Sequence, residues 1–258
     1  MEGYEIFKKN ILKLTGLNLT SYKERQMKRR IESLIKRNKY TSYSDYFKAL
    51  QINEELFDEF INYLTINVSE FYRNFEQWEV LRKTVVPKLL KNSRNLKLWS
   101  AACSTGEEPY SLVMLMSEFM PLNKIKILAV DIDEGAINKA KIGVYSKKSL
   151  DKVPDKFKKK YFTEIGKSFR ISEDIKKCVT FKKMNLLEDK YPDNCDLILC
   201  RNVMIYFTEE AKDIMYDKFS GALKNQGILF VGSTEQIIVP KKYNFMSEQT
   251  FFYTKNNK

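Results

Sequence analysis

Apolar residues in the first part of the chain recur three and four positions apart, the spacing that gathers side chains on one face of an α-helix. Two such stripes run through Met27, Ile31, Leu34 and Ile35 and through Leu56, Phe60 and Leu64. The pattern predicts a small all-helical domain over residues 1–72. The stretch that follows, residues 73–94, is predicted to be a linker helix.

From Asn95 onward the pattern changes to short apolar runs that alternate with helical stretches. The runs are "LKLWSAA", "IKILAVD", "CVTFKKM", "CDLILCR" and "GILFVGS", and the intervening helices begin near Glu107, Glu134 and Thr208. Strands that are apolar almost throughout are covered on both faces, and strand–helix alternation is typical of a doubly wound, mostly parallel sheet. The sequence therefore predicts an α/β domain over residues 95–258.

One segment interrupts this alternation. Residues 147–177 are too long for an ordinary helix-to-strand connection in a compact domain. We interpret them as a small inserted β subdomain, about residues 146–178, in which "YFTEI" and "SFRIS" form a hairpin around Gly166 and Lys167.

The amino-acid composition excludes several kinds of catalytic and metal-binding site. The 258 residues carry a formal net charge of +12 and include no histidine, so a histidine-based triad, metal cluster or proton shuttle is excluded. The four cysteines lack C-x-x-C spacing, which favours reduced thiols over a zinc site or disulfides, and no metal is expected. Without a signal peptide or an apolar run of spanning length, the chain is expected to be cytoplasmic.

The loop after the first strand, "SAACSTGEEPY", raises the question of what it binds. It has small residues, among them Ala102, but only one glycine, and Glu107 and Glu108 open the following helix. Either glutamate could simply complement the helix dipole. Two carboxylates facing a ligand would repel a phosphate and attract a cation, so the loop suits a positively charged ligand that carries an adenosine.

The later strand ends add candidates for the same pocket. Asp131 ends the second strand, where a carboxylate can accept hydrogen bonds from a ribose, although the nearby Asp133 could serve as a helix cap. Asn185 and Leu186 follow the third strand and suit an adenine. The fourth strand leads into "CRNVMIYF", which lacks the prolines typical of methyltransferases that act on nucleic-acid bases.

These segments, in this order, resemble the CheR-type chemotaxis receptor methyltransferases. The resemblance rests on "LTINVSEFYRN", "WSAACSTGEEPYSL", "AVDIDEGAINKAKIGVYS", "NLLE", "CDLILCRNVMIYF" and "GILFVGSTEQ", and it covers nearly the whole chain. It implies a Rossmann-like S-adenosylmethionine-dependent methyltransferase domain and transfer of a methyl group to glutamate side chains of methyl-accepting chemotaxis receptors. The product cofactor would be S-adenosylhomocysteine.

The resemblance also implies roles for individual residues. The expected cofactor-binding residues are Asn67, Ser69, Arg73, Ala102, Glu107, Asp131, Asn185, Leu186, Arg201 and Asn202. Glu107 or Glu108 would contact the methionyl amino group, and Arg201 and Asn202 would form the far wall. Arg73 and Tyr206 would be catalytic, guiding a receptor carboxylate that is already ionised and needs no general base. The competing interpretations are a salt bridge between domains for Arg73 and a core aromatic for Tyr206.

A basic run from Lys23 to Lys39 completes the expectations. Its residues Arg25, Lys28, Arg29 and Lys36 are predicted to dock the acidic helical coiled coil of a receptor, against the alternative of a solvated helix face.

The short predicted hairpin favours a member that does not need a receptor C-terminal peptide tether. We expect a monomer that binds no nucleic acid and meets the membrane only through the receptor. A nucleic-acid methyltransferase and a non-catalytic S-adenosylmethionine-binding module remain the alternatives.

Overall fold

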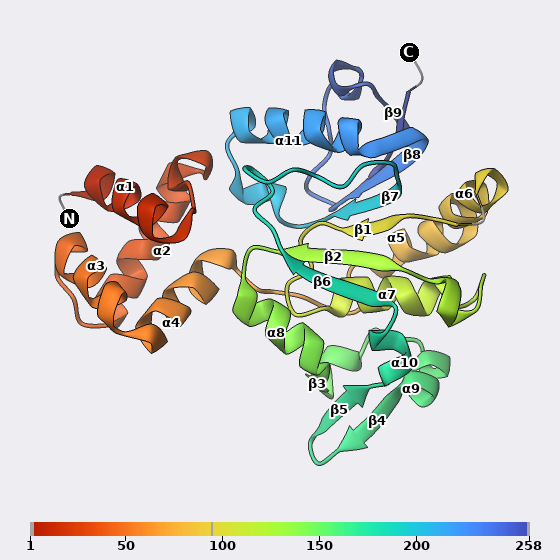
Figure 1. Cartoon of the computed structure of the whole chain (residues 1–258), viewed down its shortest axis with the longest axis horizontal. Coiled ribbons are helices and arrows are strands. Elements are labelled where there is room, and N and C mark those ends of the chain that lie inside the picture. Colours follow the sequence, from red (N-terminus) through yellow and green to blue (C-terminus); the bar gives the residue numbers. More distant parts are fainter. Residues whose placement is uncertain (1–2, 94, 257–258) are drawn as a thin grey trace. The chain divides into compact units, whose positions relative to one another are not determined.

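The computed structural model describes residues 3–93 and 95–256 and contains an all-helical part and a part built on a β-sheet (Figure 1). The chain divides into two units. Unit 1 comprises the chain up to Asn67 together with Val203–Met215, and unit 2 comprises Val68–Asn202 and the chain from Tyr216 onward. In the part of the chain that the structure describes, no helix combines the length and the apolar character needed to cross a membrane.

Unit 1 is helical, as its apolar spacing predicts. Its elements are α1 (Tyr4–Thr15), α2 (Glu24–Arg37), α3 (Tyr43–Ile52), α4 (Glu54–Thr65), the 3₁₀ turns η1 (Leu19–Ser21) and η5 (Met204–Tyr206), and the first part of α11 (Glu209–Ala222). Side-chain caps begin two of the helices: Ser42 accepts from the backbone N–H of Asp45, and Asn53 accepts from that of Leu56.

The core of unit 1 forms where the predicted stripes meet. All seven stripe residues, from Met27 on α2 to Leu64 on α4, are buried. Phe7 of α1 lies with its ring 5.1 Å from that of Tyr43 and 6.0 Å from that of Phe60, so three helices share one aromatic cluster. Burial of each such ring stabilises the fold by about 1.5–3 kcal/mol, which explains why these short helices persist.

Unit 2 is built on a seven-stranded sheet in the order β6-β2-β1-β7-β8-β10-β9. The strands are β1 (Leu98–Ser100), β2 (Ile127–Asp131), β6 (Val179–Lys183), β7 (Cys195–Cys200), β8 (Leu223–Val231), β9 (Phe245–Gln249) and β10 (Phe252–Lys255). The first five pair in parallel and match the five predicted strands. β10 pairs antiparallel with β8 and β9, an edge that the sequence analysis did not predict.

Helices cover both faces of this sheet. The helices of unit 2 are α5 (Phe75–Val80), α6 (Val86–Asn92), α7 (Glu107–Met116), α8 (Glu134–Ile142), α9 (Asp155–Tyr161), α10 (Glu173–Lys176) and the rest of α11, with the 3₁₀ turns η3 (Leu122–Lys124), η4 (Lys148–Leu150) and η6 (Pro240–Tyr243), and of these α9 and α10 lie beside the inserted subdomain (Figure 1). Leu98 of β1 joins the apolar cluster that contains α7, whereas its neighbour Trp99 lies 5.6 Å from Phe219 of α11. Successive side chains of β1 thus enter opposite layers, which is why the strands are apolar throughout.

The linker helix differs from its prediction in one respect. Between α5 and α6 the residues Leu81–Val85 form a π-helical turn, so residues 75–92 are not one regular α-helix. Pro87, two residues beyond this turn, lacks the N–H that would bond four residues back, and π-helical residues occur mostly as single turns inside α-helices.

The inserted segment forms the predicted hairpin. β4 (Phe162–Ile165) and β5 (Ser168–Ile171) pair antiparallel around Gly166 and Lys167, and β3 (Val144–Ser146) pairs with the other edge of β5. The four cysteines are buried and free, as expected for reduced thiols.

Gly106, which caps the start of α7, requires glycine. Its φ is +95°, and a Cβ built there would lie 2.8 Å from the Cβ of Ala140. We expect Gly106→Ala to lower the free energy of unfolding by about 1–3 kcal/mol. Gly221→Ala is the control, because nothing lies within 4 Å of a Cβ at that position. Chemical denaturation measures both, and equal stability of the two variants would contradict the argument.

Candidate functional site

The candidate site lies at the carboxyl ends of the parallel strands, where the strand order reverses. β1 pairs with β2 on one side and with β7 on the other, and ligands of open α/β sheets bind at such a switch point. The loop after β1 is tied to both neighbours, since Ala101 N–H donates to Leu199 O at 2.7 Å and Cys103 N–H donates to Val130 O at 2.9 Å. Ala102, between them, is partly exposed.

The two glutamates that open α7 have different surroundings. The carboxylate of Glu107 accepts a hydrogen bond from the Thr105 hydroxyl at 2.7 Å and another from Ser69. The carboxylate of Glu108 accepts from the Ser100 hydroxyl at 2.8 Å and lies 3.4 Å from Nη1 of Arg201. Burial raises the pKa of both carboxyl groups. Glu108 is thus held by an internal cation, whereas Glu107 is held by hydroxyl groups and a backbone N–H.

Asp131 is fixed at the end of β2. Its Oδ2 accepts from the backbone N–H of Ser104 at 2.7 Å and its Oδ1 from that of Asp133 at 3.0 Å. Burial raises the pKa of this carboxyl group. Asp133 caps α8 by accepting from Ala136 N–H at 3.0 Å, so of the two acidic residues Asp131 is the one at the strand tip.

The segment that carries Arg73 is held in an unusual conformation. Tyr72 and Asn74, on either side of it, both have left-handed backbones, with φ of 50° and 59°. The carbonyl oxygen of Arg73 accepts from Trp78 Nε1 at 3.1 Å and from Arg201 Nη2 at 2.7 Å. Its own Nη1 donates to Val68 O at 3.1 Å. Left-handed residues that are not glycine persist only where the surroundings fix them, and they cluster at functional sites.

The side chain of Arg201 is directed into the protein, and its predicted place in the far wall of the cofactor site stays a prediction. Only 2% of that side chain is exposed, and the guanidinium lies 5.6 Å from the Trp78 ring and 4.5 Å from the Phe230 ring. Nη2 also donates to Gln77 at 3.0 Å. The guanidinium thus serves contacts within the protein, and at this strand end Asn202 is the partly exposed residue.

Asn202 is supported by a residue that the sequence analysis missed. It has φ 61°, and its backbone N–H donates to Oε2 of Glu235 at 2.6 Å. The same oxygen accepts from Gly232 N–H at 2.8 Å, and Glu235 is 5% exposed. The sequence contains a signal for Glu235, because in "GSTEQ" it is an acidic residue four positions beyond a buried strand.

Asn185 and Leu186 follow β6. The side-chain oxygen of Asn185 accepts from Leu187 N–H at 3.1 Å, and Leu186 is 8% exposed. The Asx turn that this hydrogen bond forms fixes the backbone at the end of the strand.

Two of the expected residues belong to unit 1. Asn67 donates to the Thr65 hydroxyl at 3.0 Å, and the Tyr206 carbonyl accepts from Lys23 N–H at 2.9 Å. The contribution of Asn67 and Tyr206 to the site in unit 2 stays a prediction.

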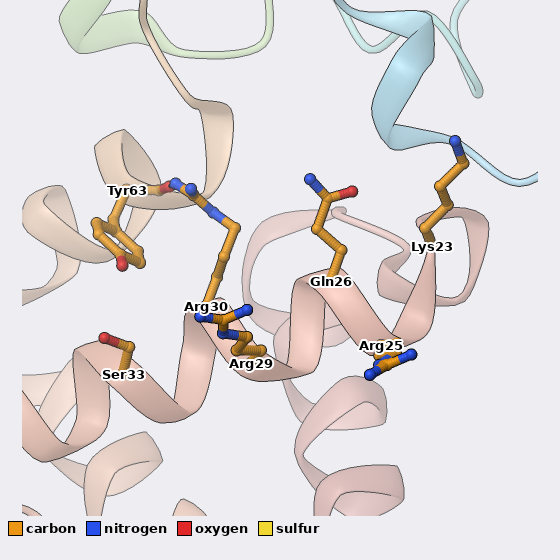
Figure 2. Close-up of a pocket in the computed structure, with 7 residues that line it drawn as sticks. All are labelled: Lys23, Arg25, Gln26, Arg29, Arg30, Ser33 and Tyr63. Carbon is orange, nitrogen blue, oxygen red and sulfur yellow. The ribbon is translucent and has the colours of Figure 1, made fainter.

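Unit 1 has a basic surface cavity of about 600 Å³ (Figure 2). It is lined by Lys23, Arg25, Gln26, Arg29, Arg30, Ser33 and Tyr63. Arg30 extends toward α4, where its guanidinium lies 4.5 Å from the Tyr63 ring. Of the four predicted docking residues, Arg25 and Arg29 line the cavity. Lys28 instead lies over the Tyr4 ring, and Lys36 is exposed outside the cavity.

Comparison with known proteins gives the family. The model of the CheR methyltransferase SAM-binding domain matches residues 67–252, and that of the CheR all-alpha domain matches residues 2–65. The chain belongs to the CheR methyltransferase family. A chemotaxis protein methyltransferase of Listeria innocua is 43% identical over 98% of this chain and 97% of its own. Those of Borreliella burgdorferi and Pseudomonas aeruginosa (methyltransferase 2) are 35% and 32% identical, each over 92% of this chain and over 88% and 87% of their own lengths.

The family fixes the cofactor as S-adenosyl-L-methionine, and the site fits it. The buried carboxylate of Glu107 opens α7 and the partly buried carboxylate of Asp131 ends β2, while the nearby guanidinium of Arg201 is engaged with Glu108. Such a set favours a ligand with a cationic and a hydroxyl-bearing part over a pyrophosphate. The CheR chain is thus a S-adenosylmethionine-dependent methyltransferase.

The buried Arg201–Glu108 pair gives a stability prediction. We expect Arg201→Met to lower the free energy of unfolding by about 3–5 kcal/mol, because it leaves the Glu108 carboxylate buried without its cation. Adding Glu108→Gln is expected to restore part of the loss. Arg82→Met, at a half-exposed ion pair with Glu79, is the control and is expected to cost about 1 kcal/mol or less. Denaturation curves that give Arg201→Met and Arg82→Met the same free energy of unfolding would contradict this.

Proposed function

We propose that this protein transfers the methyl group of S-adenosylmethionine to glutamate side chains of methyl-accepting chemotaxis receptors and forms methyl esters. The observation that carries the proposal is the end-to-end similarity to proteins named chemotaxis protein methyltransferase, with 98% of this chain covered. We propose further that it acts as a cytoplasmic monomer, binds no nucleic acid and reaches the membrane only through the receptor.

The reaction needs no general base. The cofactor supplies a methyl group on a sulfonium, and a receptor carboxylate oxygen forms the new O–CH₃ bond as the C–S bond breaks and its electron pair stays on sulfur. The nucleophile has an ordinary pKa of about 4.3 and is ionised at neutral pH. The protein therefore contributes orientation and exclusion of water, which a chain without histidine can provide.

The cofactor-binding roles follow from the surroundings of each residue. Glu107 binds the methionyl ammonium group, because Thr105 and Ser69 hold its carboxylate and no internal cation pairs with it among the described residues. Asp131 binds the ribose hydroxyls from the tip of β2. Asn185, Leu186, Ala102, Asn202 and Asn67 complete the adenine side and the walls of the pocket.

Arg73 and Tyr206 act on the receptor carboxylate. Two contacts support this role: Trp78 and Arg201 hold the Arg73 carbonyl, and Arg73 Nη1 donates to Val68 O. A side chain oriented in this way can guide a carboxylate with less loss of conformational entropy. Tyr206 would position the same carboxylate by a hydrogen bond. Arg201 acts indirectly, by holding the Arg73 carbonyl.

The cavity on α2 is the proposed docking surface for an acidic receptor helix. Its lining contains four basic side chains and no acidic one. Such complementarity accelerates association and fixes orientation. The inserted subdomain has a two-residue turn at Gly166 and Lys167, which favours a protein that does not depend on a receptor C-terminal peptide.

The decisive experiment follows labelled methyl from S-adenosylmethionine into membranes that contain a chemoreceptor. We expect label in the receptor that mild alkali releases as methanol, which identifies a carboxyl methyl ester. Alkali-stable label would indicate N-methylation and favour a nucleic-acid or amine methyltransferase. Cofactor binding without transfer would favour a non-catalytic module.

Arg73→Ala is expected to lower turnover roughly a hundredfold with little change in thermal midpoint, and full turnover by this variant would contradict its role.

Cofactor binding is expected to depend on pH through Glu107. Burial raises the pKa of this carboxyl group above its ordinary value of 4.5. As pH falls, the carboxylate is protonated earlier than an exposed glutamate and loses its attraction to the ammonium group. Affinity for S-adenosylhomocysteine should therefore weaken at a pH above the usual glutamate range.

Calorimetry between pH 8 and pH 5.5 measures this effect. Glu107→Gln should bind about tenfold more weakly at pH 8 and show a shallower pH dependence. The pH dependence that remains in this variant reflects Asp131, because burial also raises the pKa of that carboxyl group. An unchanged pH profile in Glu107→Gln would contradict the assignment.

Docking is expected to be electrostatic. Arg25→Glu combined with Arg29→Glu should weaken binding to a receptor cytoplasmic fragment about tenfold, and raised salt should weaken wild-type binding. Lys48→Glu, with a side chain 73% exposed on α3, is the matched control and should bind normally. Removal of the receptor tail should change nothing. Receptor affinity that does not change with salt would contradict electrostatic docking. A clear loss of receptor binding when the tail is removed would contradict independence of the receptor C-terminal peptide.

A further inference from the structure

We propose that Glu235 is a positioning residue of the cofactor site, which holds Asn202 in the conformation in which it contacts S-adenosylmethionine. The contact between Asn202 and the cofactor is part of the proposed function, on which this inference rests. Glu235 itself would touch neither the cofactor nor the receptor.

The geometry places one carboxylate oxygen between two strand ends. Oε2 of Glu235 accepts from Asn202 N–H at 2.6 Å, just beyond β7, and from Gly232 N–H at 2.8 Å, just beyond β8. The backbone N–H of Glu235 donates to Gly232 O at 3.0 Å, which closes a tight turn after β8. A single side chain thus links the carboxyl ends of two parallel strands at the edge of the sheet where the cofactor binds.

Asn202 has a conformation that calls for such support. Its φ of 61° is in the left-handed region, which is uncommon for residues other than glycine, although asparagine adopts it more readily than most, and neighbouring contacts help to hold it there. A charge-assisted hydrogen bond to its own N–H is a direct means of doing so. Loss of that bond would free the backbone to relax and would turn the side-chain amide away.

Gly232 shows how closely the three residues are packed. A Cβ at this position would lie 2.3 Å from Oε2 of Glu235, 2.9 Å from the Asn202 backbone nitrogen and 3.0 Å from its side-chain nitrogen. The amide group of Asn202 therefore lies directly against the glycine backbone. Its direction depends on the same contact that Glu235 makes.

Burial argues that the carboxylate has a specific task. Glu235 is 5% exposed, and removing a carboxylate from water is costly unless the protein replaces its hydration with directed donors. A backbone–backbone link between β7 and β8 already exists in the strand pairing from Cys195 to Cys200. The added connection therefore acts on the residues beyond the strands, of which Asn202 is one.

A purely structural role makes a different prediction from a positioning role. If Glu235 only stabilises the sheet, its loss lowers the thermal midpoint and leaves the affinity of the folded protein unchanged. If it positions Asn202, its loss weakens cofactor binding, and the effect disappears once the Asn202 side chain is removed.

The test is a double-variant cycle read by calorimetric binding of S-adenosylhomocysteine, with thermal midpoints measured in parallel. Glu235→Gln removes the charge and one acceptor oxygen, and Glu235→Asp keeps the charge but withdraws it. Either variant should weaken binding about fivefold to tenfold, so the test stands if one of them fails to fold. Asn202→Gly removes the amide and suits the left-handed backbone.

The matched control is Glu248→Gln. This half-buried carboxylate lies on β9 and contacts Lys88 and Thr254, and its loss should leave affinity unchanged. In the Asn202→Gly background, Glu235→Gln should change affinity by less than about twofold, which would support the inference.

Three results would overturn it. Wild-type affinity of Glu235→Gln and Glu235→Asp, with weakened binding by Asn202→Gly, would reject the role of Glu235 and leave the proposed function intact. An equal loss from Glu235→Gln with and without the Asn202 amide would reject it in the same way. Wild-type affinity of Asn202→Gly would reject both the cofactor contact of Asn202 and the inference.

Discussion

The burial of one guanidinium organises the methyltransferase domain. Arg201 leaves the end of β7, passes between the rings of Trp78 and Phe230, and reaches the carboxylate of Glu108 on α7. Its other nitrogen binds the carbonyl oxygen of Arg73, which precedes α5. A buried charge must be matched by partners, so this single side chain fixes the strand end, the helix after the binding loop and the Arg73 segment with respect to one another.

The buried charges of the domain are distributed unevenly. Buried Glu107, Glu108 and Glu235 and partly buried Asp131 lie near the carboxyl ends of the strands, where Arg201 is a buried cation. Each acid has directed donors: hydroxyls for Glu107, backbone N–H groups for Asp131 and Glu235, and the guanidinium for Glu108. Preorganised acceptors of this kind suit a ligand with an ammonium group and ribose hydroxyls. The basic residues that give the chain its net charge lie elsewhere, and a cluster of them lines the cavity on α2.

Some of the described left-handed residues other than glycine flank or form the proposed site, whereas others, such as Lys39 and Gln226, lie elsewhere. Tyr72 and Asn74 hold left-handed conformations on both sides of Arg73, and Asn202 does so beyond β7. Hydrogen bonds stabilise both segments. Trp78 and Arg201 donate to the Arg73 carbonyl, and the backbone N–H of Asn202 donates to Glu235. Interior hydrogen bonds thus hold the backbone next to buried Tyr72 and partly exposed Asn74 and Asn202.

The sequence by itself determined the elements and most of the site's chemistry. Helical spacing, apolar runs and the positions of Glu107, Asp131 and Asn202 at strand ends are local properties, and the structure contains the helices and the five parallel strands that they predict. Strand β9 escaped prediction because its exposed positions weaken the apolar pattern, and β10 escaped because its buried run is short. The π turn escaped because a single proline does not show how a helix will adjust. Only the tertiary structure decided which glutamate faces Arg201, that Arg201 turns inward and that Glu235 supports Asn202. Those outcomes depend on contacts between residues tens of positions apart, from the 33 that separate Asn202 from Glu235 to the 93 that separate Glu108 from Arg201, and no local pattern records such distances.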